Sequence, residues 1–350
     1  MNQTVLVTGG TGFVAGWCIV ELLRRGYIVR TTVRSLAKEP AMRKAVAAQV
    51  DAGDRLAFFV ADLTEDAGWQ SAMTGCDYVL HVASPLGIGS GSQEDLTIPA
   101  REGTLRVLRA ATEAGVKRVV MTSAAAVATP PLQQGDSLSD ETVWFDPREP
   151  NVDAYRQSKR LAEQAAWDFV RSNNPSPALT TILPGAVFGP VLTKENLGSV
   201  QIIGRLLQGR VAANPRLGFE VVDVRDLADV HIRAMESPRA AGERFLAVGE
   251  FIWMSDISRT LRTQLGAAAS KVPTRILPDF IFRLSALFDA SLRPMTPRLG
   301  RKYLHTSAKA RELLGWQPRS TVATLVDCAR SLASEEPVAT RHQGPGKRDR

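Results

Sequence analysis

Val5-Leu-Val-Thr-Gly9-Gly-Thr-Gly12-Phe-Val-Ala15 is the stretch that decides the fold of this chain. It begins as an apolar run of strand length, passes through a glycine-rich turn and continues with helical spacing. Gly9 allows the tight bend after the strand, and Gly12 lets the backbone approach a pyrophosphate at the helix N-terminus. Ala15 is small enough for close packing of helix on strand. The stretch therefore predicts a dinucleotide-binding unit.

Short apolar strands alternate with helices over the first half of the chain. The predicted strands are Thr4–Thr8, Ile28–Val33, Leu56–Ala61, Tyr78–Val82, Val116–Thr122 and Leu179–Leu183. The predicted helices are Gly12–Arg25, Glu39–Val50, Leu96–Ala114 and Tyr155–Arg171. Near-continuous apolar strands separated by helices are typical of a parallel sheet that is covered on both faces. We therefore expect an α/β fold with a Rossmann-type doubly wound parallel sheet.

Beyond Pro190 the pattern becomes irregular and indicates a smaller, mixed region. The predicted strands there are Glu220–Val224 and Arg244–Val248, and the predicted helices are Asp226–Glu236, Ser255–Leu265, Ile276–Leu287 and Thr321–Ser334. We expect a nucleotide-binding domain over 1–190, a substrate-binding region over 191–334 and a disordered basic tail over 335–350. Residues 220–236 resemble one more strand–helix unit that returns to the main sheet.

Composition limits the classes of function. The chain has 350 residues, a net charge of +7 and only three cysteines, which are too scattered for a disulfide framework or a zinc site. Much of the positive charge lies at Arg341–Arg350 and near Arg293–Lys302, without a basic stripe interleaved with aromatics, so nucleic-acid binding is not expected. With four scattered histidines, no metal site is expected either.

The hydropathy of the sequence does not suggest a membrane partner. No apolar run approaches the roughly 18 residues that a membrane span needs, and strand-like sequence starts directly after Met1, where a signal peptide would stand. We expect a cytoplasmic enzyme that is a monomer or a homodimer.

The second predicted strand selects the cofactor. NAD enzymes end this strand with an acid that binds the ribose 2′-hydroxyl, whereas here it ends in Thr32-Val33-Arg34. Arg34 can pair with a 2′-phosphate, so the sequence predicts NADP(H), with Lys38 as a possible helper. Asp62-Leu63 is placed to contact the adenine, and Val82-Ala83-Ser84 to line the cofactor with small side chains.

Tyr155 and Lys159 stand four residues apart in a predicted helix, so their side chains share one face. Such a pair is usually a solvated surface. After a nucleotide-binding turn, however, it indicates hydride chemistry in which a phenol supplies the proton.

These motifs together resemble the extended short-chain dehydrogenase/reductases, and within them the dihydroflavonol reductase, cinnamoyl-CoA reductase and aldehyde reductase branch. The similar stretches are Val5–Ala15, Gly26–Arg34, Ala61-Asp-Leu63, His81-Val-Ala-Ser-Pro85, Lys117–Ser123, Tyr155–Trp167, Pro184-Gly-Ala-Val-Phe-Gly-Pro190 and Val222–His231.

The resemblance implies roles for particular residues. Tyr155 would donate a proton to the substrate carbonyl, while Lys159 would bind the nicotinamide ribose and lower the pKa of the phenol. The residues expected beside the nicotinamide are Pro184, Gly185 and Val187. Thr11, Phe13, Val14 and Thr122 complete the expected cofactor contacts.

One position departs from the family pattern. Members of the family typically read Thr-Ser-Ser after the fifth strand, and the second Ser binds the substrate carbonyl, but this chain reads Thr122-Ser123-Ala124. Successive strand residues face opposite sides, so Ser123 can take the catalytic role only if the strand ends or bulges there. Otherwise a water or a residue of 125–130 replaces it, or the enzyme is weak.

The function expected is an NADPH-dependent reductase of an apolar or aromatic aldehyde or ketone. A nucleotide-sugar epimerase or dehydratase is the main alternative, although Ala124-Ala125 lacks the acid that dehydratases carry after that Thr. A cofactor-sensing protein that has lost catalysis is the third. His81 and His231 are expected to be structural, and Trp144-Phe145 and Phe188 are candidates for either pocket wall or core.

Overall fold

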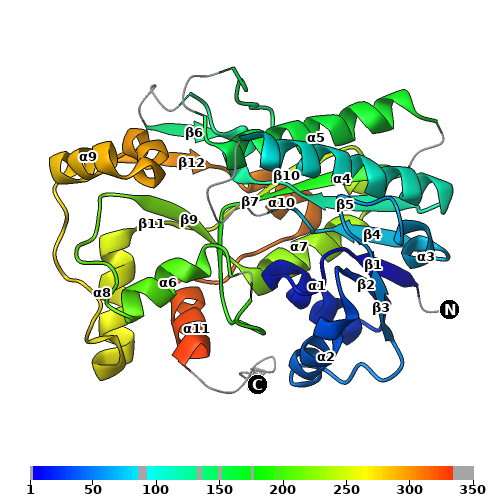
Figure 1. Cartoon of the computed structure of the whole chain (residues 1–350), viewed down its shortest axis with the longest axis horizontal. Coiled ribbons are helices and arrows are strands. Elements are labelled where there is room, and N and C mark those ends of the chain that lie inside the picture. Colours follow the sequence, from blue (N-terminus) through cyan, green and yellow to red (C-terminus); the bar gives the residue numbers. More distant parts are fainter. Residues whose placement is uncertain are drawn as a thin grey trace, which may run out of the picture.

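A seven-stranded parallel sheet forms the centre of the structure, a computed structural model that describes residues 3–85, 93–131, 136–148, 152–174, 177–195 and 197–333. The strand order is β10-β7-β5-β4-β1-β2-β3 (Figure 1). The strands are β1 (Thr4–Val7), β2 (Ile28–Val33), β3 (Leu56–Val60), β4 (Tyr78–His81), β5 (Arg118–Thr122), β7 (Ala178–Pro184) and β10 (Arg244–Ala247). This is the expected Rossmann-type sheet, and the fold prediction is confirmed.

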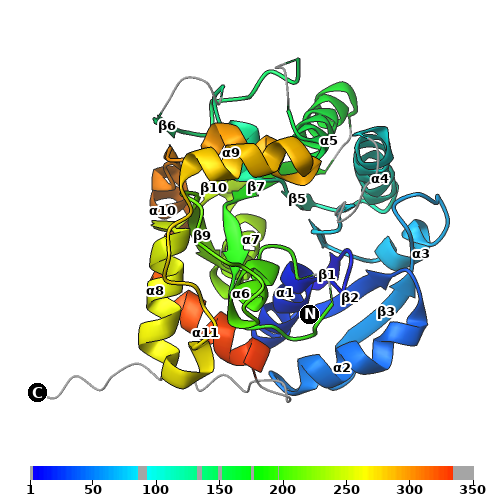
Figure 2. The same ribbon diagram turned by 60° about the vertical axis from the view of Figure 1, so that its left-hand side comes forward.

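Helices cover both faces of this sheet (Figure 2). One face carries α1 (Phe13–Arg24), α2 (Glu39–Ala47) and α7 (Val224–Glu236); the other carries α3 (Trp69–Met73), α4 (Gln93–Glu113) and α5 (Ala154–Ser172). The two buried apolar clusters follow this division, with Trp17 in the first and Trp69 in the second. Helix α1 is buried along most of its length because its sequence is almost continuously apolar.

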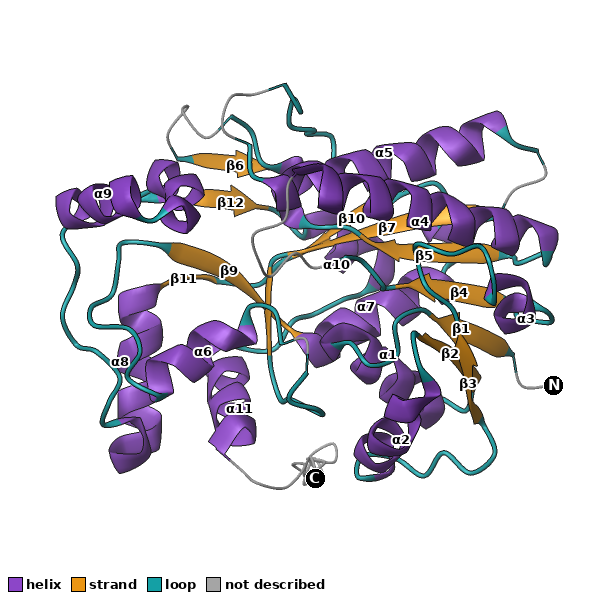
Figure 3. Ribbon diagram, in the orientation of Figure 1, coloured by secondary structure: helices purple, strands orange, loops and turns teal. Residues whose placement is uncertain are grey.

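The smaller part of the molecule is built on a second, three-stranded sheet (Figure 3). This sheet consists of β11 (Phe251–Trp253), β9 (Gly218–Asp223) and β8 (Ala186–Phe188), and its apolar cluster includes residues of α6 (Val200–Leu207), α8 (Met254–Leu265) and α11 (Thr321–Ala333). The other strands and α-helices in the described ranges are β6 (Ser137–Ser139), which pairs with β12 (Tyr303–His305), and the helices α9 (Asp279–Phe288) and α10 (Ala308–Leu314).

One expectation about these strands is wrong. The strand of the predicted 220–236 unit does not return to the main sheet, because β9 pairs with β8 and β11; only its helix, α7, returns. The strand that does join the main sheet is β10, beside β7. The cause lies at Gly185, where a Cβ atom would stand 2.4 Å from the carbonyl oxygen of Glu220. Glycine at this break between β7 and β8 lets β9 approach closely.

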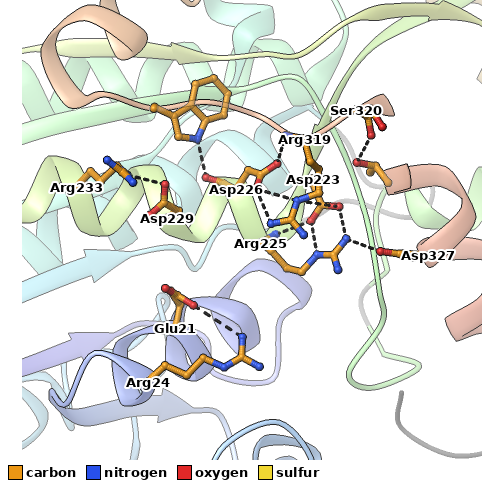
Figure 4. Close-up of polar contacts among 12 residues, drawn as sticks. Glu21, Arg24, Asp223, Arg225, Asp226, Asp229, Arg233, Arg319, Ser320 and Asp327 are labelled. Carbon is orange, nitrogen blue, oxygen red and sulfur yellow. Dashed lines mark hydrogen bonds and ion pairs between the residues drawn. The ribbon is translucent and has the colours of Figure 1, made fainter. Parts of the chain in front are cut away.

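Charged residues at the start of α7 hold the C-terminal segment in place (Figure 4). Asp223 caps the helix by accepting from the Arg225 amide, and the Arg225 guanidinium binds both Asp223 and Asp327 of α11 at 2.8 Å. Arg319 binds Asp226 at 2.7 Å. Because Asp226 is largely buried, its carboxyl pKa is raised in spite of this partner.

Within the described ranges, no helix has the length and apolarity that a membrane crossing requires. The predicted tail, 335–350, lies outside the residues that the structure describes.

Candidate active site

A cavity of about 560 Å³ opens along the carboxyl ends of the main-sheet strands. This volume lies in the range of roughly 300–1,000 Å³ that is usual for small-molecule sites. The predicted cofactor residues that line it are Gly9, Thr11, Gly12, Phe13, Val14, Arg34, Asp62, Leu63, Val82, Ala83, Ser84, Thr122, Tyr155, Lys159, Pro184, Gly185 and Val187. Ser123 also lines it, whereas Lys38 does not.

The glycine turn has the shape that a dinucleotide requires. Gly9 has a φ of +74°, and a Cβ atom there would stand 3.0 Å from the Cβ of Ala83. Gly12 is the N-cap of α1. Because glycine has no side chain, it does not cap the first N–H groups of the helix. Such a helix start favours an anion, and the residues present therefore fit a pyrophosphate.

Arg34 follows β2 at the edge of this cavity, and none of the ion pairs within the described ranges involves it. Its charge is one of the minor causes that lower the pKa of Asp62, after the hydrogen bonds from Thr64. Lys38 is directed elsewhere, because its Nζ lies 2.5 Å from Oε2 of Glu195. The structure thus brings Arg34, but not its predicted helper, to the site.

Helix α5 presents Tyr155 and Lys159 to the same cavity. The helix starts at Ala154, and the Asp153 side chain caps it by accepting from the amide of Arg156 at 2.8 Å. Nζ of Lys159 donates to the carbonyl oxygen of Thr122 at 3.2 Å, which fixes the ammonium beside the end of β5.

The surroundings shift both pKa values. Although 39% of Tyr155 is exposed toward the cavity, the protein atoms around it desolvate the phenol and raise its pKa to about 12, with a smaller contribution from Asp153. Burial lowers the pKa of Lys159 to about 8, and the charge of Glu163 opposes this. The net shift of the Tyr155 pKa is therefore upward, and a lowering of this pKa by Lys159 stays a prediction.

The strand geometry of β5 continues beyond its last residue. The Ser123 amide donates to the carbonyl oxygen of Ile182 at 2.7 Å, and Ala124 is extended, with φ −156° and ψ 144°. The bulge that would turn the Ser123 hydroxyl toward the other side is therefore missing.

The two hydroxyl groups before Ala124 consequently point to opposite faces of the sheet. Thr122 Oγ1 hydrogen-bonds Nε2 of His231 on α7 at 2.7 Å, while Ser123 Oγ donates to Oε2 of Glu163 on α5 at 2.5 Å. The catalytic role predicted for Ser123 requires its hydroxyl to leave this carboxylate.

The segment 125–130 offers little in its place. Thr129 carries the only polar side chain there, and its hydroxyl donates to the Ala125 carbonyl and contacts Nε2 of His305 at 3.1 Å. Thr129 is buried and does not line the cavity.

A buried polar cluster lies on the same face of α5 as Tyr155 and Lys159, one turn after Lys159. The Glu163 carboxylate is fully buried and accepts from Ser123, from Thr181 Oγ1 at 2.8 Å and from Arg244 Nε at 2.8 Å. The Arg244 guanidinium also lies 3.6 Å from the ring centroid of Trp144. These contacts connect α5 with β5, β7 and β10.

The aromatic candidates for the pocket wall belong to the core instead. Trp144 packs under Arg244, Phe145 is buried under the Arg156 guanidinium, and Phe188 is buried in the cluster around the smaller sheet. None of the three aromatic side chains lines the cavity.

Both singled-out histidines have structural hydrogen bonds, as expected. Nδ1 of His81 lies 3.0 Å from the Thr8 hydroxyl, and Nδ1 of His231 lies 2.7 Å from the Leu227 carbonyl oxygen. Burial lowers the pKa of His81 to about 3 and that of His231 to about 4, so both rings are neutral near pH 7. No group of three or more potential metal ligands gathers within the described parts of the chain.

Some lining residues were not predicted: Thr32, Val33, Ala61, Thr64, Trp69, Pro85, Pro99, Leu197, Gly198 and Ser199. Proximity to Arg34 and Asp62 could have indicated the first four. Residues 197–199 belong to the irregular stretch after β8, where the sequence offers no motif.

The comparisons with known proteins agree with this geometry. Residues 5–249 match the model of the NAD dependent epimerase/dehydratase family, and the chain belongs to that family. The resemblance to the reductase branch of the extended short-chain dehydrogenase/reductases is thereby confirmed.

Three curated relatives illustrate this branch. Cinnamoyl-CoA reductase 1 of Oryza sativa subsp. japonica is 36% identical over 265 residues, covering 75% of each chain. Anthocyanidin reductase ((2S)-flavan-3-ol-forming) of Vitis vinifera is 36% identical over 69% of this chain and 75% of its own. Ketoreductase azaE of Aspergillus niger is 34% identical over 80% of this chain and 87% of its own.

Solved structures extend the likeness to nearly the whole chain. The yeast methylglyoxal/isovaleraldehyde reductase Gre2, complexed with NADPH, has a TM-score of 0.78 at 25% identity and covers 94% of this chain and 98% of its own. The Candida albicans Gre2 in complex with NADPH has a TM-score of 0.77 at 27% identity, with coverage of 95% and 98%.

Arg244→Met is expected to lower the free energy of unfolding by roughly 3–5 kcal/mol, because it leaves the Glu163 carboxylate buried without its cation. Urea unfolding followed by circular dichroism measures the loss. The control is Arg148→Met, which removes a solvent-exposed ion pair with Asp146 and should cost about 0–1 kcal/mol. Equal losses in the two variants would show that the buried pair does not stabilise the fold.

Proposed function

We propose that this protein is an NADP(H)-dependent oxidoreductase that reduces an aldehyde or ketone, or catalyses the reverse oxidation of the alcohol. The observation that carries the proposal is the position of Tyr155 and Lys159 on one face of α5, in the same cavity as the glycine turn. The relatives named as reductases and the Gre2 complexes with NADPH support it.

The residues of the cavity divide into holding and reacting groups. The start of α1 at Gly12 would hold the pyrophosphate, and Arg34 the 2′-phosphate. Lys159 would bind the nicotinamide ribose, with Pro184 and Val187 beside the ring. Bound there, NADPH supplies a hydride for carbonyl reduction.

Tyr155 is the proposed proton donor. With a pKa of about 12, the phenol keeps its proton near neutral pH and can pass it to a carbonyl oxygen that gains negative charge. Lys159, with a pKa of about 8, is mostly an ammonium at that pH and can stabilise the phenolate that remains. Its charge is lost as the pH rises above 8, where activity should decline.

The carbonyl oxygen lacks the second hydroxyl donor that the family usually provides at the position of Ala124. Ser123 stays a candidate only if its hydroxyl leaves Glu163, so we propose that a water fills this role or that turnover is slow. Loss of one such donor costs roughly a hundredfold or more in rate, which leaves a weak but active enzyme.

The substrate proposed is apolar or aromatic. The lining residues that have no proposed cofactor contact include the apolar side chains of Leu197, Pro85 and Pro99. These side chains offer hydrophobic contact and no charge that would favour an ionic substrate.

Tyr155→Phe is expected to lower the rate of carbonyl reduction roughly 10²–10⁴-fold, because it removes the proton donor, while NADPH binding stays within a few-fold. The assay is NADPH absorbance with a panel of aryl and alkyl aldehydes and ketones. Tyr78→Phe, which lies outside the cavity lining, is the control and should keep its rate. Normal turnover by Tyr155→Phe would refute the mechanism, and a wild type that binds NADPH but reduces no carbonyl would indicate a sensor.

Arg34→Ala is expected to raise the dissociation constant for NADPH at least roughly tenfold, because a hydrogen bond to a charged group is lost. The constant for NADH should change little. Titration of intrinsic fluorescence measures both. Lys38→Ala is the matched control and should leave both constants nearly unchanged, because Lys38 pairs with Glu195 outside the cavity. An equal effect of Arg34→Ala on the two cofactors would remove Arg34 from the phosphate site.

Ala124→Ser is expected to raise kcat by up to about a hundredfold, because it supplies the missing hydroxyl donor to the developing oxyanion. Steady-state kinetics on the best carbonyl of the panel provide the measurement. Ala126→Ser adds a hydroxyl two residues further on and should not change kcat. If Ala124→Ser also leaves kcat unchanged, another group already donates to the carbonyl oxygen.

A further inference from the structure

Helix α9 carries a band of large apolar side chains on its outer surface. Phe280, Ile281, Leu284, Leu287 and Phe288 are between 38% and 87% exposed. Seven of the thirteen large apolar residues exposed in the described ranges fall between Ile276 and Met295, so they form a patch rather than a scatter. Contiguous patches of this kind mark interaction sites.

The patch faces away from the body of the protein. At 3.6 residues per turn, Leu284 lies at the centre of the band and the other four side chains lie within about 60° of it. The buried residues of the helix, Phe282 and Ala286, lie about 160° from Leu284. Figure 1 shows α9 at one end of the molecule, where such a face is open to a partner.

The five residues of this band are arranged symmetrically about Leu284. Phe280 and Phe288 stand four residues on either side, and Ile281 and Leu287 stand three. Two antiparallel copies of α9, related by a two-fold axis beside Leu284, therefore place Phe280 opposite Phe288 and Ile281 opposite Leu287. A surface that matches itself in this way is what an isologous dimer interface requires.

We propose that α9 docks on α9 of a second copy of this chain and forms a homodimer. The charge of the band argues against the alternative of a lipid surface, because residues 276–295, which include its margins, hold two aspartates and two arginines, a net charge of zero. Helices that lie on anionic membranes carry lysine and arginine on their polar face. With Ile276 and Met295 at its margins, the band offers seven exposed large apolar side chains to a partner.

The dimer leaves the cavity untouched. No residue of α9 lines it, so the proposal does not depend on the proposed function, and cofactor binding should be the same in monomer and dimer.

Light scattering coupled to size-exclusion chromatography, over a dilution series, tests the oligomeric state. The wild type should be a dimer, and Leu284→Asp should be a monomer with unchanged NADPH binding, because it sets two carboxylates face to face at the two-fold axis. The control is Val322→Asp on α11, where Val322 is 46% exposed, and this variant should stay dimeric. A wild type that is monomeric throughout, or a Leu284→Asp variant that stays dimeric, would overturn the proposal.

A cysteine at the axis tests the geometry independently of any charge effect. Leu284→Cys should form a disulfide-linked dimer under mild oxidation, because a residue beside a two-fold axis meets its own copy. The native thiols Cys18, Cys76 and Cys328 are buried and do not compete. Val322→Cys should not cross-link. Absence of the Leu284→Cys cross-link would contradict the two-fold arrangement, and Leu284-dependent binding of a monomer to anionic vesicles would assign the face to lipid.

Discussion

The buried carboxylate of Glu163 fixes the position of helix α5 on the sheet, and the candidate active site depends on that position. Glu163 accepts hydrogen bonds from Ser123 directly after β5, from Thr181 on β7 and from Arg244 on β10. A buried charge is tolerated only when its hydrogen-bonding capacity is used and a counter-charge is close, and both conditions hold here. Because Tyr155 and Lys159 lie two turns and one turn earlier on the same helix, the rotation that places Glu163 in the core also turns these two side chains toward the cavity.

The same interaction explains what this chain keeps and what it lacks. The Ser123 hydroxyl binds Glu163 and so helps to hold α5 on the sheet. The hydroxyl group that binds the substrate carbonyl in the family would therefore have to come from the next residue that shares a strand face with Thr122. Ala124 occupies that position without disturbing the extended backbone. An alanine at this position is therefore compatible with the local backbone, and a chain that retains Tyr155 and Lys159 can carry it and still fold around the cavity.

Much of the fold and of the site could be predicted because local sequence determines it. The glycine turn, the strands from Thr4 to Leu183 and the Tyr155/Lys159 pair depend on residues a few positions apart. The errors concern partners far away in the chain. Lys38 pairs with Glu195 across 157 residues, and β9 joins β8 because Gly185 permits a close approach to Glu220. The pKa of Tyr155 depends on atoms from several elements that no periodicity specifies.

Helix α9 shows the same limit in a different way. Its sequence predicts a helix over Ile276–Leu287, close to the observed Asp279–Phe288. Apolar residues occur on several sides of this helix, however, so their spacing along the sequence does not indicate which side is buried. The protein places the smaller apolar face, Phe282 and Ala286, against its own core and leaves the wider one in water. Exposing the wider face costs free energy that a monomer does not recover, whereas a symmetrical partner removes the same side chains from water on both copies at once.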